Sequence, residues 1–192
     1  GEGHLRVYID GEDRFGRIES GNLSTGLNTE VLDISGLAVG PHRIRVRAFY
    51  SNGDPYPNPS SSADGIFFVD DGSPQIVIVE PKPGHVQRID SSMAVTIAAI
   101  NWTWNNANTA LAENEGHTHV YSLPNYPACL AVDPTSDEYC NNFYLASLSG
   151  VGDPANSILI HGEVTADNLG LLSPGSQPFQ AGLQTNEHDP FP

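Results

Sequence analysis

The chain contains one nine-residue phrase twice. Residues 2–10 read EGHLRVYID and residues 115–123 read EGHTHVYSL, so Gly-His and Val-Tyr recur at an offset of 113 residues. Two later blocks recur at an offset of 135 residues: GLAVG at 36–40 resembles LLSPG at 171–175, and DPYP at 54–57 matches DPFP at 189–192. Because the features recur in the same order, we predict an internal duplication with 22 additional residues in the second copy.

Alternation of apolar and polar residues predicts β-strands in both copies. HRIRVRAFY at 42–50 places Ile44, Val46 and Ala48 on one face of a strand and three arginines on the other. No stretch keeps an apolar period of 3.6, and 19 Gly and 15 Pro argue against long helices. The chain is therefore expected to be all-β, with further strands at 5–10, 29–34, 65–71, 73–85, 93–104 and 115–123.

The stretch DDGSP at 70–74 is the expected linker between two domains, 1–72 and 73–192. About 40 residues, IVIVEP through NWTW, precede the EGH strand of the second copy, whereas only Gly1 precedes that of the first. Conversely, the first copy continues beyond DPYP, and the second ends with DPFP. We therefore expect the first copy to lack its opening strands and the second to lack its closing strand.

The short strands, closely spaced turns and the segment LDISGLAVGPHRIRVRA resemble an immunoglobulin-like β-sandwich, as found in subunits of extracellular filaments and surface adhesins. The resemblance implies two tandem sandwiches. It does not extend to the Cys, Trp and Cys arrangement of antibody domains. An incomplete sandwich would expose apolar surface and unpaired backbone, so a neighbouring repeat or a strand from another subunit is expected to complete it. The first copy could instead be a smaller, divergent sandwich.

Two cysteines, Cys129 and Cys140, lie in the Pro-rich and Asp-rich part of the second copy. A disulfide between them would close the insertion at about 124–145 and would indicate an oxidising compartment. Two unrelated thiols are the alternative. The chain also begins without Met and enters a strand pattern at once, so we expect a processed, extracellular protein.

Charge and motifs exclude several classes of function. The chain has 8 Lys and Arg against 23 Asp and Glu, a formal net charge of -15, which would repel the phosphates of nucleic acid. No apolar run approaches the roughly 20 residues that span a bilayer. Neither a G-x-S-x-G nucleophile motif nor a phosphate-binding loop is present, and we expect no enzymatic activity.

Metal binding is an alternative function. His117 and His119 are two residues apart, so on a strand their imidazoles share one face and could hold one Cu or Zn ion, with His188 and Asp189 as additional ligands. A histidine with a structural hydrogen bond is the competing interpretation. Calcium is a further possibility at turn carboxylates, although none follows the EF-hand pattern; these are Asp10, Glu12, Asp13, Asp70, Asp71 and Asp133.

The sequence suggests two relations to sugars, N-linked glycosylation and carbohydrate binding. Asn22-Leu-Ser and Asn101-Trp-Thr are acceptor sequences for N-linked glycans. Alternatively, a carbohydrate-binding module could stack sugars on aromatic rings. The candidate rings are Trp102, Trp104, Tyr121 and Tyr126, although Trp102 and Trp104 could equally pack the core from one face of a strand.

Taken together, these features predict a structural subunit of an extracellular filament or surface array, whose main partners are copies of itself. Metal-binding and carbohydrate-binding proteins are the alternatives. The assembly interface is expected at the open ends of the two sandwiches, formed by Leu5, Val7, Ile9, Phe179, Ala181, Leu183 and Phe191.

Overall fold

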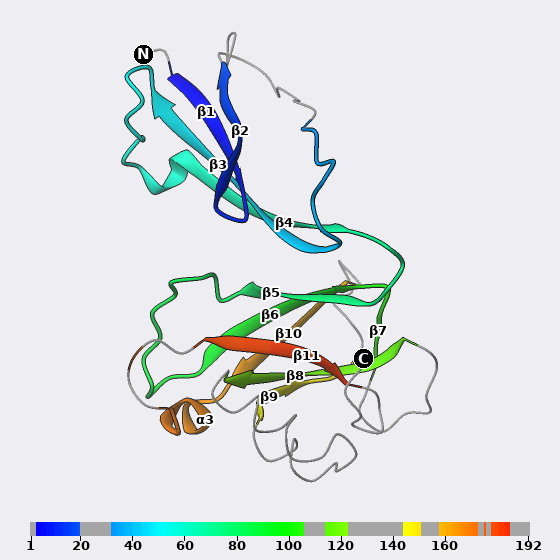
Figure 1. The fold of residues 1–192 in the computed structure, drawn as a ribbon. Helices are drawn as coiled ribbons and strands as arrows, with labels where there is room; N and C mark the ends of the chain where they lie inside the picture. The colour runs from blue at the N-terminus through cyan, green and yellow to red at the C-terminus, as the bar shows by residue number, and fades with distance from the viewer. Residues whose placement is uncertain are drawn as a thin grey trace. The chain divides into compact units, whose positions relative to one another are not determined.

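The computed structural model describes residues 3–19, 32–105, 114–122, 144–150, 158–172, 175 and 178–184. Across these ranges strands predominate, and the α-helix α3, Ala166–Gly170, is only five residues long. The all-β prediction is therefore confirmed (Figure 1). The chain forms two compact units, Gly1–Asp71 and Gly72–Pro192, which divide within DDGSP, one residue from the expected boundary.

Unit 1 contains an antiparallel sheet in the order β2-β1-β3-β4. Asp10 and Gly11 form the two-residue turn between the first two strands, with φ angles of 52° and 87°, as a tight hairpin requires. A 3-10 turn, Pro59–Ser61, precedes the last strand. The strands are β1 Gly3–Ile9, β2 Glu12–Glu19, β3 Gly40–Tyr50 and β4 Ser62–Val69.

The centre of the unit 1 sheet has an apolar face. Ile9 pairs with Ile44, Val7 with Val46, and Leu5 with Ala48, as alternation along β3 predicts. Val7 and Ile9 are 3% and 1% exposed. These pairs put the aliphatic side chains of neighbouring strands together, which stabilises the sheet through apolar burial.

The other face of this sheet carries arginines. Arg6 lies opposite Arg47 in the ladder, a pairing of like charges that is unfavourable by itself. Phe49 offsets it: the guanidinium carbons of Arg6 and Arg47 lie 4.8 Å and 5.8 Å from the centre of its ring. Asp13 also forms an ion pair with Arg6 at 3.7 Å.

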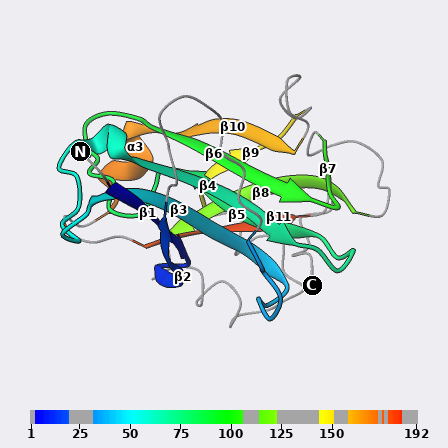
Figure 2. The same cartoon turned by 90° about the horizontal axis from the view of Figure 1, so that it is seen from above.

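Unit 2 is built from two sheets. In one, β6 lies between β10 and β5; in the other, β8 lies between β11 on one side and β7 and β9 on the other (Figures 1 and 2). Side chains from both sheets form one buried apolar cluster, which is compatible with a β-sandwich. The strands are β5 Gln75–Glu80, β6 Met93–Ile100, β7 Thr103–Trp104, β8 Glu115–Ser122, β9 Tyr144–Leu148, β10 Leu159–Val164 and β11 Phe179–Gln184.

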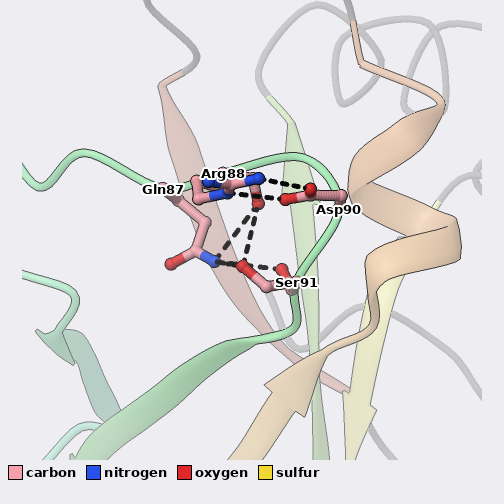
Figure 3. Close-up of polar contacts among 4 residues, drawn as sticks. All are labelled: Gln87, Arg88, Asp90 and Ser91. Carbon is pink, nitrogen blue, oxygen red and sulfur yellow. Dashed lines mark hydrogen bonds and ion pairs between the residues drawn. The ribbon is translucent and has the colours of Figure 1, made fainter.

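The loop between β5 and β6 is ordered by its own polar contacts. Figure 3 shows Arg88 bound to both carboxylate oxygens of Asp90, at 2.9 Å and 2.6 Å. The side-chain amide of Gln87 donates to the Ser91 carbonyl at 3.0 Å and hydroxyl at 2.9 Å. These exposed bonds shape the turn but contribute little to global stability, because water competes for them.

The two units share a strand register. In unit 1, β1 and β3 pair His4 with Phe49; in unit 2, β8 and β11 pair His117 with Gln184. The sequence offsets of 113 and 135 residues map the first pair onto the second. Both units therefore place the Gly-His strand between two antiparallel neighbours. Gly3 is required there, because a Cβ atom on it would lie 2.6 Å from the Phe49 carbonyl oxygen.

Two expectations need correction. The predicted strand at 29–34 is not formed at 32–34, and 29–31 lie outside the described residues. In unit 2, β10 is paired with β6. Among the described residues, the sheet of unit 1 contains no strand that corresponds to β6. The open end expected at Leu5, Val7 and Ile9 is also not found, because β1 is paired on both sides.

Candidate metal-binding histidine pair

Every second residue of β8 from position 117 to 121 places an aromatic ring with a polar atom on the same face of the strand. These residues are His117, His119 and Tyr121. The Nε2 atoms of the two histidines are 3.1 Å apart, and the rings meet edge to face at an interplanar angle of 62°. The Nδ1 atom of His119 lies 3.2 Å from the Tyr121 hydroxyl. All three side chains are buried, with exposed fractions of 0%, 2% and 0%.

The position of β8 in its sheet fixes the backbone that carries these three side chains. β8 is flanked by β11 on one side and by β7 and β9 on the other, so both of its backbone edges are paired along most of its length. On its opposite face, Val120 joins the apolar cluster and Thr118 donates a hydrogen bond to the Gly182 carbonyl at 2.9 Å. The backbone that carries the histidine pair is therefore held on a central strand.

The described contacts limit what the pair can do chemically. A nitrogen pair at 3.1 Å is either a hydrogen bond, in which one Nε2 keeps its proton, or two lone pairs directed at one cation. If the Nδ1–H of His119 donates to the Tyr121 oxygen, the Nε2 of His119 must be the unprotonated nitrogen. Both arrangements are then available at this distance.

Within the ranges that the structure describes, no group of three or more His, Cys, Asp or Glu side chains is arranged to hold a metal ion. The predicted additional ligands, His188 and Asp189, lie outside those ranges. The candidate site thus consists of two imidazoles from a single strand.

Unit 1 carries a different set of residues at the same positions. His4 occupies the place of His117 and Tyr8 that of Tyr121, but Arg6 replaces His119. His4 is 2% exposed and stacks on Phe49 with ring centres 5.5 Å apart. Neither of its ring nitrogens has a hydrogen-bond partner among the described residues. A guanidinium beside a lone imidazole repels cations, so unit 1 has no equivalent metal-binding pair.

The predicted calcium ligands of the first turn already have partners in the protein. One carboxylate oxygen of Asp10 lies 2.6 Å from His42 Nδ1, and the other accepts the Arg43 backbone N–H at 2.9 Å. Asp13 is paired with Arg6. Both carboxylates therefore have a structural role in unit 1.

Sequence reasoning missed His42, a buried residue of β3 whose ring contacts Asp10 and Ala38. Its Nε2–H donates to the Ala38 carbonyl at 2.8 Å while Nδ1 faces Asp10. The bond to Ala38 and the contact with Asp10 raise the pKa of His42 above its usual 6.5. No local signal identifies this residue, because its carboxylate partner is 32 positions away.

Three of the four candidate sugar-stacking rings are buried. Trp102 and Trp104 are 8% and 5% exposed and belong to the apolar cluster, and Tyr121 is buried beside His119. Trp104 Nε1–H donates to the Ile158 carbonyl at 3.2 Å. The core-packing alternative for the two tryptophans is the one that the structure bears out.

The Asn101 glycosylation site is exposed, and its side-chain amide donates to the Ser73 carbonyl at 2.9 Å. Asn101 has a positive φ of 55° in the turn after β6. Its glycosylation stays a prediction. Other predicted residues lie outside the described ranges: Asn22, Tyr126, Cys129, Asp133, Cys140 and Phe191.

In the described part of the chain, no helix is long and apolar enough to cross a membrane. Comparison of the whole chain with protein-family models, curated proteins and solved structures finds no significant match.

Proposed function

We propose that this chain is a structural part of an extracellular filament or array in which one β-repeat recurs and neighbouring repeats complete one another's sheets. The observation that carries the proposal is the shared register of the two Gly-His strands, which relates β1 and β3 to β8 and β11. A repeat that recurs with the same strand pairing is typical of proteins built as arrays.

The edge of β11 indicates where a neighbour would bind. In unit 1, β4 pairs with β3 over eight residue pairs, from Gly40 with Val69 to Arg47 with Ser62. β11 corresponds to β3, and within the described ranges its one ladder partner is β8. An edge strand with unpaired backbone groups is a template for an added strand.

Side chains on β11 also favour the addition of a β-strand at this edge. Phe179 and Ala181 are half-buried, and Leu183 is 7% exposed and packed in the apolar cluster. A strand added beside them would extend the sheet and cover apolar surface at the same time. The residues Phe179, Ala181 and Leu183 thus remain the proposed assembly interface on unit 2.

An extracellular location is part of the proposal. It is supported by a charged fraction of only 16%, by abundant turn residues, and by two cysteines in a chain of 192 residues. The acidic surface would keep such an assembly soluble.

The test uses a peptide with the β4 sequence SADGIFFV, residues 62–69, fused to a solubilising tag. We expect the full chain to bind it and to become more stable, because the peptide supplies the strand that β11 lacks. Binding would be measured by fluorescence anisotropy, with a scrambled peptide as control. Negative-stain micrographs of the concentrated chain would be examined for filaments. Equal binding of both peptides, or a monodisperse chain that binds neither, would contradict the proposal.

A further inference from the structure

We propose that His117 and His119 bind one divalent transition-metal ion of the copper and zinc class through their Nε2 atoms, and that Tyr121 positions His119 for this role. This inference concerns the interior of unit 2 and is independent of how copies of the chain assemble.

The distance between the two nitrogens suits a shared metal ion. Imidazole nitrogens bind zinc at about 2.0–2.1 Å, so two of them 3.1 Å apart subtend about 95–100° at the ion. That angle lies between the square-planar arrangement favoured by Cu²⁺ and the tetrahedral arrangement of Zn²⁺. Binding would therefore need only small adjustments of the two rings.

The surroundings of the pair favour coordination in three ways. Both histidines stand on a strand that is paired on both sides, so the backbone spacing between them is set in advance. Both are almost fully buried, which weakens competition from water. When the Nε2 of His119 is the unprotonated nitrogen, its Nδ1–H donates to the Tyr121 oxygen 3.2 Å away, the outer contact that commonly orients a metal-binding imidazole.

The repeat contains a natural comparison. Unit 1 keeps the histidine and the tyrosine, as His4 and Tyr8, but has Arg6 at the position of the second imidazole. That arginine contacts Phe49 and Asp13, a structural arrangement with no ligand role. The two copies thus differ at His119, the residue that supplies the second imidazole.

Among the described residues, no third side chain of the usual ligand types joins the two imidazoles. Imidazole suits both copper and zinc, and Cu²⁺ forms the more stable complexes with a given nitrogen site. We therefore expect Cu²⁺ to displace Zn²⁺ from the pair.

The experiment adds copper sulfate to the purified full chain, removes the excess by dialysis, and measures bound copper by mass spectrometry. We expect about one copper ion per chain. Pulsed electron paramagnetic resonance then counts the coordinated imidazoles, and two are expected. No retained copper, or a spectrum that shows a single coordinated imidazole, would overturn the proposal. Because this experiment uses the wild-type protein, its outcome does not depend on whether a variant folds.

Variants locate the ion. His119→Arg reproduces the residue of unit 1 and His119→Asn is a smaller change; both are expected to abolish retention. Tyr121→Phe removes only the orienting oxygen and is expected to weaken copper affinity about 10- to 100-fold. The matched control is His85→Gln, because His85 is exposed and its ring contacts Gln87 on the loop. Full copper retention by a folded His119→Asn protein would overturn the assignment.

Discussion

At the residue scale, His42 shows how one buried imidazole joins distant parts of unit 1. Nε2 must donate to the Ala38 carbonyl, which can only accept, so a neutral ring would direct the lone pair of Nδ1 at the Asp10 carboxylate. The protonated ring donates from both nitrogens. Partial burial would raise the pKa of the Asp10 carboxyl, but the hydrogen bonds from the Arg43 N–H and from His42 outweigh it and lower the pKa below its usual 3.8.

These pKa shifts predict how the stability of unit 1 changes with pH. The raised pKa of His42 adds stability that is fully present below pH 6.5 and is lost as pH rises through the folded-state pKa. The lowered pKa of Asp10 adds stability that is present above pH 3.8 and is lost as pH falls through its own folded-state pKa. We expect the protection of the β1 and β3 amides from hydrogen exchange, corrected for the intrinsic exchange rate, to be greatest between these limits.

A His42→Gln variant provides the comparison, because glutamine can donate to a carbonyl but does not titrate. Its exchange rates are expected to lose the alkaline part of the pH dependence after correction for intrinsic exchange. An unchanged pH profile in this variant would show that His42 is not the titrating group.

At the scale of elements, unit 2 depends on the close approach of β9 and β10. A Cβ atom on Gly162 would lie 2.6 Å from Cγ of Leu148, which is buried in the apolar cluster at 3% exposure. We predict that Gly162→Ala lowers the free energy of unfolding of unit 2 by about 1–3 kcal/mol, because the core must shift to make room.

Tryptophan fluorescence during urea unfolding measures this change, since both tryptophans of the chain, Trp102 and Trp104, lie in the core of unit 2. Gly170→Ala, at the end of α3, is the matched control, because among the described residues no atom beyond its own helix and its chain neighbours lies within 4 Å of the added Cβ. Equal stability of the two variants would argue against tight contact between Gly162 and Leu148.

Strands were also the features most accessible to sequence reasoning. Alternation in HRIRVRAFY anticipated the pairing of Ile44 and Val46 with the apolar residues of β1, because side chains alternate on any strand whatever its partners. The same pattern could not show that β1 is a central strand, or that residues 32–34 stay outside the sheet. Strand order depends on which remote segments are present to pair.

At the scale of the whole molecule, charge is divided unequally between the two units. Residues 1–71 contain six of the eight basic side chains against eleven acidic ones, and residues 72–192 contain two basic against twelve acidic. Several of the arginines share one face of the unit 1 sheet, and the side chain of Arg45 is 60% exposed. Unit 1 therefore has a formal net charge of −5 and unit 2 of −10, so whole copies of the chain repel one another.

This distribution predicts that self-association of the full chain is sensitive to salt. Raising ionic strength from about 0.01 M to 1 M shortens the screening length from about 30 Å to 3 Å, so the repulsion between copies is screened and association measured by sedimentation should strengthen. Arg45→Glu should weaken it at low salt. Association that weakens at high salt would contradict this prediction and would indicate that oppositely charged patches, rather than apolar contacts and strand pairing, hold the copies together.

The sequence by itself determined the all-β character and showed that the same short phrases recur in two parts of the chain. It also determined that His117 and His119 share a strand face. These properties follow from local composition and from the two-residue period of a strand, which are independent of the rest of the chain. The metal site, the glycans and the assembly interface stay predictions.

Only the tertiary structure decided that β8 is buried on both faces, that two Nε2 atoms come within 3.1 Å, and that His42 meets Asp10. It also placed Trp102 and Trp104 in the core, which removes them as a sugar platform. Burial and side-chain distance depend on how segments far apart in the chain pack together. The pairing of these segments minimises the apolar surface exposed by a whole unit, so no local sequence pattern specifies which segments pair.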